Sequence, residues 1–464
     1  MATTRRDFLR NSACALGSMA MASSLESFGI VNALTPQAAT GYKALVCIFL
    51  NGGNDGNNVL VDLNQYASYA TGRGVDIAIP QAQLLPVSPS GGGSFGFHPN
   101  MPEVQALFNQ GKLAVVCNNG PLVEPLSRAT YQNGTGKKPL QLFSHSDQVG
   151  LYSTGIANIV AQTGWGGRVA DLTRSLNGLA SFPSNVSIAG INLILTGIDT
   201  RQLAVADSNT PLANVLQLNN GAGASASDNA SRTIAFDQLR TLDNTFKLVK
   251  AASDTRSSAI QTDIALSAVS PVLATVFPAT GLGRQLLQIA RLIKACTDPA
   301  AGINMKRQIF FAQIGGFDTH SGQILGQGNL MTEVSRAMKA FYDATVELGR
   351  QNEVTTFTLS DFSRTLQPSG TGTGAGSDHA WGNNHLVLGG AVAGNTLYGT
   401  YPTLALGGPN DTDGGSAPRG RWIPTTSVEQ FAATLATWYG LSPTDLPAVF
   451  PLIGRFPTPN LGFV

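Results

Sequence analysis

Charged residues are scarce in this chain. Only 12% of its 464 residues are charged, and the two signs nearly cancel to a net charge of +1. The chain therefore lacks the basic excess that nucleic acids and anionic membrane surfaces attract, and we expect neither as a partner. The 52 glycines and 24 prolines indicate many loops on a packed scaffold, because apolar runs recur up to the C-terminus.

Cysteine is also scarce, with four residues. If Cys14 leaves with an N-terminal signal, three widely spaced cysteines remain, and these provide no disulfide framework. No Cys-Xaa-Xaa-Cys pair occurs, which excludes a structural zinc site built on thiolates. Cys47 and Cys117 lie in apolar runs, so we expect both to be small buried residues.

Long apolar runs are missing as well. The weakly apolar stretch at residues 12–24 is too short to span a bilayer. It follows Arg5-Arg6-Asp7-Phe8-Leu9, which has the form of a twin-arginine export motif, and small-residue cleavage sites follow before residue 40. We therefore expect a signal peptide and linker over 1–40, export by the twin-arginine translocase, and a periplasmic or extracellular mature chain without a transmembrane segment. The alternative is an ordinary basic N-terminus.

Strand and helix patterns alternate at both ends of the remaining chain. Apolar runs typical of buried strands occur at 43–50, 113–117, 307–314, 354–359 and 385–389. Helical patterns occur at 101–110, 331–350 and 428–439. The first strand, helix and second strand are expected to form a parallel crossover unit. The alternation predicts a three-layer α/β/α sandwich with a mainly parallel sheet over residues 41–464.

Residues 182–300 break this alternation. They show β character at 186–205 and helical periodicity at 230–252 and 283–295. We expect them to form a mixed β and helical insertion.

Histidine and aspartate recur in short loops where the predicted strands end. In open α/β sheets, ligands bind beyond the carboxyl ends of the strands, and imidazole with carboxylate is the ligand set of Zn²⁺, Mn²⁺ or Fe²⁺. The candidate metal ligands are Asp55, Asp318, His320, Asp361, His379 and His385. Together they provide enough donors for two divalent ions about 4 Å apart, which can clamp an in-line displacement at phosphorus. The alternative is a set of loop-capping aspartates and hydrogen-bonded histidines.

Several motifs carry a resemblance to a known family. They are Phe49-Leu-Asn-Gly-Gly-Asn-Asp-Gly, Gly316-Phe-Asp-Thr-His320, Ser360-Asp-Phe-Ser-Arg-Thr and Ser377-Asp-His-Ala-Trp-Gly, with Thr163-Gly-Trp-Gly-Gly-Arg168 and Gly420-Arg-Trp-Ile-Pro424. In combination they resemble a family of secreted bacterial proteins, the domain of unknown function numbered fifteen hundred and one, over essentially the whole mature chain. The resemblance implies the alkaline phosphatase and sulfatase superfamily, whose members use two metals on an α/β/α sandwich.

The resemblance also implies roles for the candidate ligands. One metal set would be Asp318, His320 and His385, and the other would be Asp55 and Asp361 with His379. Two departures stand out. The superfamily spacing Asp-Xaa-Xaa-Xaa-His is Asp318-Xaa-His320 here, and Phe362 follows Asp361 where the superfamily has histidine.

The stretch 143–155 resembles the segment that carries the superfamily nucleophile. Ser144 is the first candidate nucleophile and Ser146 the second, because a serine at a helix N-terminus beside a metal can ionise and attack; a helix-capping role for Ser144 is the alternative. His145 would bind the transferred group or a metal. Arg364 would grip an anionic oxygen bidentately or form a structural ion pair.

These features predict the class of reaction. No Cys-Xaa-Pro-Xaa-Arg occurs, so the formylglycine of sulfatases cannot form, which favours phosphate esters. We expect an exported metal-dependent hydrolase of phosphate mono- or diesters that acts on a small or polymeric anionic ester. The alternative is a non-catalytic periplasmic binding or assembly protein on a degenerate hydrolase scaffold.

Overall fold

The structure is a computed structural model that describes residues 41–180, 182–212, 272–299 and 302–464, together with scattered positions between 227 and 262. The predicted signal segment at 1–40 and most of the helical pattern at 230–252 lie outside the described residues. Among the described helices, none combines the length and the apolar composition that crossing a bilayer requires.

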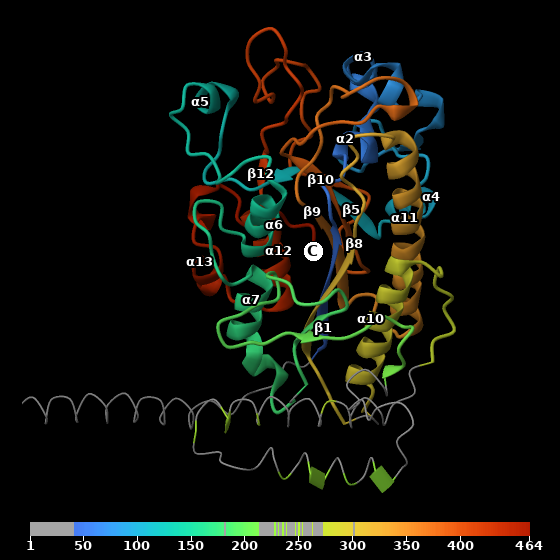
Figure 1. The fold of residues 1–464 in the computed structure, drawn as a ribbon, viewed down its shortest axis with the longest axis vertical. Coiled ribbons are helices and arrows are strands. Elements are labelled where there is room, and N and C mark those ends of the chain that lie inside the picture. Colours follow the sequence, from blue (N-terminus) through green and yellow to red (C-terminus); the bar gives the residue numbers. More distant parts are fainter. Residues whose placement is uncertain are drawn as a thin grey trace, which may run out of the picture.

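A mainly parallel sheet runs through the centre of the molecule (Figure 1). Its strands, in spatial order, are β11 (Leu397–Tyr398), β5 (Leu113–Gly120), β10 (Asn383–Leu388), β9 (Val354–Ser360), β1 (Lys43–Leu50), β8 (Arg307–Ile314), β6 (Asn185–Ser187) and β7 (Leu203–Ala204), and β12 (Thr426–Ser427) also pairs with β5. β10 pairs antiparallel with β5 and β9, and the other pairings are parallel.

The three central strands end level with one another. β1 is a nearly unbroken apolar run, as expected for a strand covered on both faces. Its last residue, Leu50, pairs with Ile314 of β8 and with Ser360 of β9. The loops that follow these strands therefore leave the sheet side by side, at one edge.

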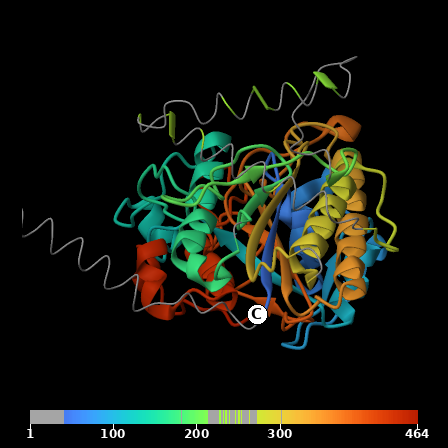
Figure 2. The same ribbon diagram turned by 90° about the horizontal axis from the view of Figure 1, so that it is seen from below.

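Helices cover both faces of the sheet (Figures 1 and 2). On one face lie α4 (Pro102–Asn109), α10 (Gly281–Thr297) and α11 (Gln323–Glu347), and on the other α6 (His145–Thr154), α7 (Trp165–Thr173), α12 (Val428–Tyr439) and α13 (Leu446–Val449). Alternate residues of a strand face opposite sides, so Val46 joins the core under α10 and α11, whereas Cys47 joins the core under α7 and α12.

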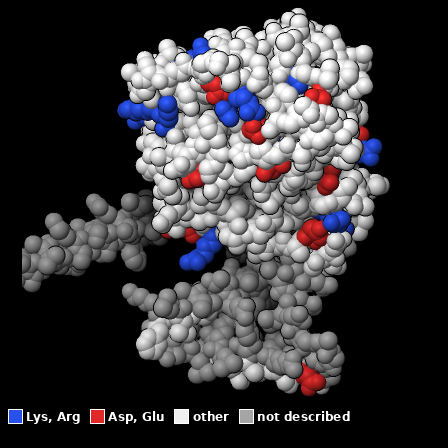
Figure 3. Space-filling view, turned by 45° about the horizontal axis from the view of Figure 1, so that its top comes forward, with Lys and Arg blue, Asp and Glu red and all other residues white. Residues whose placement is uncertain are grey.

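Shorter elements lie around the end of the sheet where β1 stops (Figure 1). They are α2 (Gly56–Val59), α3 (Tyr66–Ile77), α5 (Arg128–Gln132) and a small antiparallel sheet of β2 (Leu60–Asp62), β4 (Phe95–Phe97) and β3 (Leu85–Val87). The face in Figure 3 shows charged residues of both signs scattered among uncharged ones, without a basic field.

The predicted α/β fold with a mainly parallel sheet is confirmed, with corrections in detail. β1 and β5 run parallel but are separated by β9 and β10, so they are not neighbours. α11 begins at Gln323, eight residues before its predicted start at residue 331. The segment predicted as an insertion supplies β6, β7 and α10 to the main layers. Cys47, Cys117 and Cys296 are buried and unpaired.

Candidate metal centre

Four segments converge at the edge where β1, β8 and β9 end. Asp318 and His320 lie in the loop after β8, and Asp361 directly follows β9. His379 precedes β10, which begins at this edge because it is antiparallel to β9. His145 is the first residue of α6. The topology thus brings together residues that are up to 234 positions apart.

Gly52 in the loop after β1 allows two of these loops to approach closely. Its φ is +117°, and a Cβ there would lie 2.4 Å from the backbone nitrogen of Asp318. Its own N–H donates to Asp361 Oδ1 at 2.9 Å. A side chain at position 52 would push the β8 loop away from the loop that follows β1.

Three histidine nitrogens and one carboxylate oxygen point at a common centre. His379 Nε2 lies 3.1 Å from His145 Nε2 and 2.9 Å from His320 Nε2. Asp318 Oδ1 lies 3.1 Å from His320 Nε2 and 3.5 Å from the Nε2 atoms of both His145 and His379. The ligand atoms of His145, Asp318 and His379 all lie within 4.8 Å of one another, so these three could hold one ion, and His320 Nε2 adjoins two of them.

The outer nitrogen of each imidazole faces an oxygen. These oxygens are Asp361 Oδ2, 2.7 Å from His145 Nδ1; the Phe143 carbonyl oxygen, 2.8 Å from His379 Nδ1; and Asp378 Oδ1, 3.2 Å from His320 Nδ1. Carboxylate and carbonyl oxygens accept hydrogen bonds, so each Nδ1 carries the proton and each Nε2 presents a lone pair to the centre. Lone pairs at this spacing repel one another unless a cation or a proton lies between them. The same arrangement orients histidine ligands in zinc proteins.

Phe143 holds its carbonyl in place at the cost of backbone strain. Its φ is +71°, a region that non-glycine residues seldom adopt and that clusters at functional sites. The guanidinium of Arg421 lies 5.2 Å from the centre of its ring and donates from Nε to the His379 carbonyl oxygen at 3.0 Å. Arg421 thus ties the Phe143 loop to the His379 loop.

Arg364 is fully buried behind the centre. Its Nη1 and Nη2 donate to Asp318 Oδ1 at 3.1 and 2.6 Å, and its Nε donates to the Ser377 carbonyl oxygen at 3.1 Å. Burial lowers the pKa of its guanidinium, and the carboxylates around it, Asp318 first, oppose that shift. Of the two roles that the sequence left open, these contacts are those of an ion pair that orients Asp318.

The centre is open to solvent on one side. The side chains of Asp318 and His320 are 47% and 46% exposed, whereas Asp361 is fully buried. Burial lowers the pKa of His379, the hydrogen bond to the Phe143 carbonyl opposes this shift, and the nearby Arg364 reinforces it. An incoming ligand therefore has access from the Asp318 and His320 side.

Ser144 precedes α6 at its N-cap position, but its side chain does not cap the helix. Its Oγ donates to Asp147 Oδ2 at 2.5 Å and lies 3.4 Å from Ser146 Oγ. The hydroxyl thus has a carboxylate that can accept its proton, one residue before a histidine of the centre.

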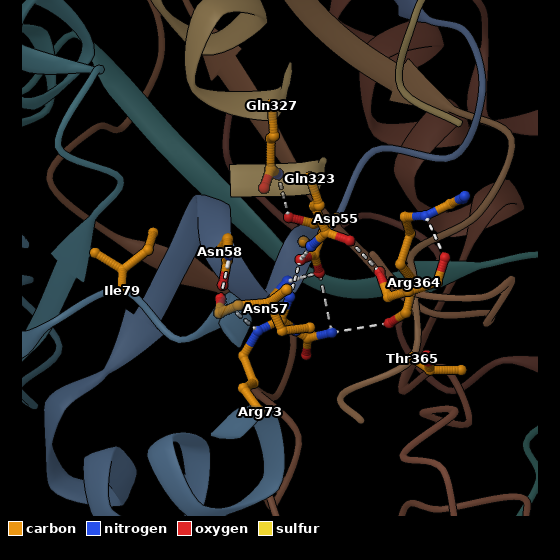
Figure 4. Close-up of polar contacts among 12 residues, drawn as sticks. Asp55, Asn57, Asn58, Arg73, Ile79, Gln323, Gln327, Arg364 and Thr365 are labelled. Atoms are coloured by element: carbon orange, nitrogen blue, oxygen red, sulfur yellow. Dashed lines mark hydrogen bonds and ion pairs between the residues drawn. The ribbon is translucent and has the colours of Figure 1, made fainter. Parts of the chain in front are cut away.

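Asp55 lies elsewhere, in a buried polar cluster (Figure 4). Its Oδ2 accepts from Arg73 and, at 2.5 Å, from Gln323 Nε2, while its Oδ1 accepts from the backbone and side-chain nitrogens of Asn57. Gln323 in turn accepts from Ser377 Oγ. Donors from the protein surround this carboxylate, so the predicted metal set of Asp55 with Asp361 does not assemble.

His385 also lies apart from the centre, inside β10 rather than before it. Its Nε2 is 3.4 Å from the Tyr152 hydroxyl, and its ring packs against Phe431. Burial lowers its pKa to about 3. The reason is the direction of β10: His379 lies at its start, at the sheet edge, and each later residue lies deeper in the sheet.

Sequence reasoning missed three contributors to this region. Arg73 gave no signal, because its partner Asp55 is 18 positions away. The carbonyl of Phe143 has no sequence signature, since every residue carries one. Asp378 stood in the Asp-His pair next to His379, and its neighbours could have marked it as the orienting partner of a ligand.

Comparison with known proteins gives one family and several distant structures. No curated protein matches the sequence. Among solved structures, Ps i-CgsB in complex with k-i-k-neocarrahexaose is similar at 10% identity and a TM-score of 0.33, over 88% of this chain and 74% of that one. A sulfatase from Pseudoalteromonas sp. is similar at 10% identity and 0.32, over 90% and 70%. The phosphonate monoester hydrolase of Agrobacterium radiobacter is similar at 8% identity and 0.32, over 86% and 74%.

The family comparison covers most of the chain. The family described as "Protein of unknown function (DUF1501)" matches residues 42–414. This range includes all four inward-facing ligand atoms and the oxygens that orient the histidines. The chain therefore belongs to the DUF1501 family.

Proposed function

We propose that this chain is a metal-dependent hydrolase of phosphate esters with one divalent ion held by His145, His320, His379 and Asp318. The observation that carries the proposal is the convergence of His145, Asp318 and His379, whose ligand atoms lie within 4.8 Å of one another, with His320 Nε2 lying 2.9 Å from His379 Nε2 and 3.1 Å from Asp318 Oδ1. Imidazole nitrogens with one carboxylate oxygen suit Zn²⁺ or Fe²⁺ better than Mn²⁺. Such an ion supplies Lewis-acid polarisation of an ester oxygen.

The chain's own residues would set up the reaction around that ion. Asp361, the Phe143 carbonyl and Asp378 fix the tautomers of the three histidines, and Arg364 orients Asp318. The open side next to Asp318 and His320 admits an anionic ester. We expect the N-terminus of α6 to favour the negative charge of that ester.

Ser144 is the proposed nucleophile. Its proton would pass from Oγ to Asp147 Oδ2, 2.5 Å away, as the new bond to phosphorus forms and the bond from phosphorus to the leaving oxygen breaks. Water would then release the phosphate from the serine. If water attacks directly instead, Ser144→Ala retains turnover, so this variant separates the two routes.

Metal content and turnover test the proposal together. We expect one ion per purified chain by elemental analysis and turnover of 4-nitrophenyl phosphate or of bis(4-nitrophenyl) phosphate. His320→Ala and His379→Ala should lose both, whereas the control Asp343→Ala, a surface partner of Lys339, should keep both. A chain that binds no transition metal, or turnover that survives both histidine changes, would overturn the proposal. One bound ion without turnover would favour the non-catalytic binding protein.

We also propose that the protein is exported through the twin-arginine pathway to the periplasm or beyond. The support is Arg5-Arg6 followed by Phe8-Leu9 and a short apolar stretch. Replacing both arginines by lysine should leave the full chain in the cytoplasm, as measured by fractionation. Unchanged export of that variant would exclude this pathway.

A further inference from the structure

A cleft of about 900 Å³ lies next to the candidate metal centre. Four segments form its walls: the start of α11, the last turn of α3 with the residues that follow it up to residue 83, the turn at 98–100 and the loop at 372–375. Its volume is in the range of clefts that bind small organic molecules.

The walls of the cleft continue directly into the loops of the metal centre. Gly322 lines the cleft two residues after His320, and Ala375 lines it three residues before Asp378. The two segments are joined by backbone hydrogen bonds, from Gln323 N to the Ala375 oxygen at 3.0 Å and from Ser377 N to the Thr319 oxygen at 3.2 Å. The cleft and the metal centre thus share these two connected loops.

Much of the cleft is apolar and faces solvent. Leu325 and Ile324, in the first turn of α11, are 73% and 42% exposed, and Val75, near the end of α3, is 96% exposed. Ile79 and Pro99 add further apolar surface. Large apolar side chains that are exposed together in a hollow commonly mark a binding site.

One polar group on the wall is buried and has an unused donor. His98 is 3% exposed, and its Nδ1 accepts from the Asn100 backbone N–H at 3.1 Å. The proton of the neutral ring therefore lies on Nε2, which has no hydrogen-bond partner in the part of the chain that the structure describes. Burial lowers the pKa of His98 to about 4, so this group is a neutral donor above that pH.

The charge on the cleft walls disfavours anions. Among the described residues that line the cleft, Asp76 is the acidic one, where it accepts from Gly372 N at 2.8 Å, and none is Lys or Arg. A polyanionic chain would meet no cation here.

We propose that the cleft binds an uncharged, largely apolar organic group that carries a hydrogen-bond acceptor, which Nε2 of His98 recognises. If the proposed function holds, this group is the leaving-group side of the ester, so the substrate is a phosphate ester of an apolar alcohol or phenol rather than a segment of a polyanionic polymer.

Direct binding to the full chain, with metal removed by a chelator, tests the cleft without relying on turnover. The probes are 2-acetylnaphthalene, which is uncharged and carries a carbonyl; 2-ethylnaphthalene, which lacks the acceptor; and 2-naphthoate, which is an anion. We expect 2-acetylnaphthalene to bind best. Leu325→Asp should weaken its binding about tenfold, because an apolar contact surface is replaced by a charge.

The matched control is Val346→Asp, an exposed apolar position on the same helix but outside the cleft. It should bind all three probes like the wild type. His98→Phe keeps an aromatic ring but removes the donor, and should weaken 2-acetylnaphthalene about fivefold while leaving 2-ethylnaphthalene unchanged, since a neutral hydrogen bond contributes about that much.

The outcomes separate this inference from the proposed function. Failure of all three probes to bind, stronger binding of 2-naphthoate, or equal binding by Leu325→Asp and Val346→Asp would overturn the cleft proposal even if aryl phosphates are hydrolysed. Binding that Leu325→Asp weakens, in a chain that hydrolyses no ester, would support the cleft and overturn the hydrolase.

Discussion

Two aspartates that follow central strands behave differently in this fold. Asp55 and Asp318 each lie in a glycine loop just beyond a strand, and both were predicted to bind metal. Asp55 is fully buried and is surrounded by donors from Arg73, Gln323 and Asn57. Asp318 is 47% exposed; its Oδ1 accepts from Arg364 and also lies 3.1–3.5 Å from three imidazole nitrogens. The comparison teaches that the groups facing a carboxylate decide whether it stabilises the fold or is available to a cation.

The largest expected effect concerns the buried member of this pair. Asp55→Ala would leave Arg73 as an uncompensated buried charge, which should lower the free energy of unfolding by about 3–5 kcal/mol. Urea denaturation of the metal-free protein measures it. The double variant Asp55→Leu with Arg73→Met should lose less than the single variant, because neither charge remains. If Asp55→Ala and the wild type were equally stable, Asp55 would not stabilise the fold, and the contrast drawn with Asp318 would be wrong.

At the exposed centre, we expect a substitution to change metal affinity strongly and stability little. His320→Ala should weaken metal binding by more than about 100-fold, because loss of a ligand exceeds the loss expected for an outer partner. Its side chain is 46% exposed, so the free energy of unfolding of the metal-free protein should change by no more than about 1 kcal/mol. Isothermal titration calorimetry with Zn²⁺ measures the metal affinity, and urea denaturation measures the free energy of unfolding. Unaltered Zn²⁺ affinity would place the ion elsewhere.

A smaller effect should appear behind the centre. Asp361→Asn would weaken the hydrogen bond that orients His145 and should reduce metal affinity about 10- to 100-fold. The ion count at saturating metal should stay at one per chain. If Asp361 is itself a ligand, as the sequence predicted, the loss should match that of His320→Ala instead.

The smallest expected effect tests whether His385 is a buried residue, like Asp55, rather than part of the exposed centre. Its folded pKa of about 3 lies below the unfolded value, so the native state binds fewer protons between about pH 3 and 6.5. The contribution of His385 to the free energy of unfolding is fully present above about pH 6.5. It is lost as the pH falls toward 3, by about 1 kcal/mol per pH unit. In the metal-free protein, His385→Gln should show a correspondingly shallower slope between pH 6 and 5. An identical slope would contradict the burial of a neutral ring.

The sequence predicted the secondary structure well where apolar patterns were long. The strands at 43–50 and 307–314 and the helix at 428–439 match β1, β8 and α12 residue for residue. The start of α11 was missed, because its first turns carry glycines and few periodic apolar residues. Strand order was missed as well, since patterns of single strands contain no information on which strand lies beside which.

The candidate site was predicted only in part, because the sequence patterns do not show which loops lie side by side. Asp318, His320 and His379 were named from their loops, and His145 was named without a definite role; the structure gathers His145, Asp318 and His379 into one group and places His320 beside His379. Asp55 and His385 were also named as ligands from the sequence, but their surroundings in the fold differ from those of the other four residues. The direction of β10 buries His385, and α3 delivers Arg73 to Asp55.

The sequence by itself determined the α/β class and the loops that hold the histidines and aspartates, because hydrophobic periodicity and glycine turns are local properties of the chain. Only the tertiary structure decided which of these side chains meet. That choice depends on strand order, on the antiparallel direction of β10 and on donors that come from distant helices. Those long-range pairings separate a saturated buried carboxylate from one that faces three imidazoles.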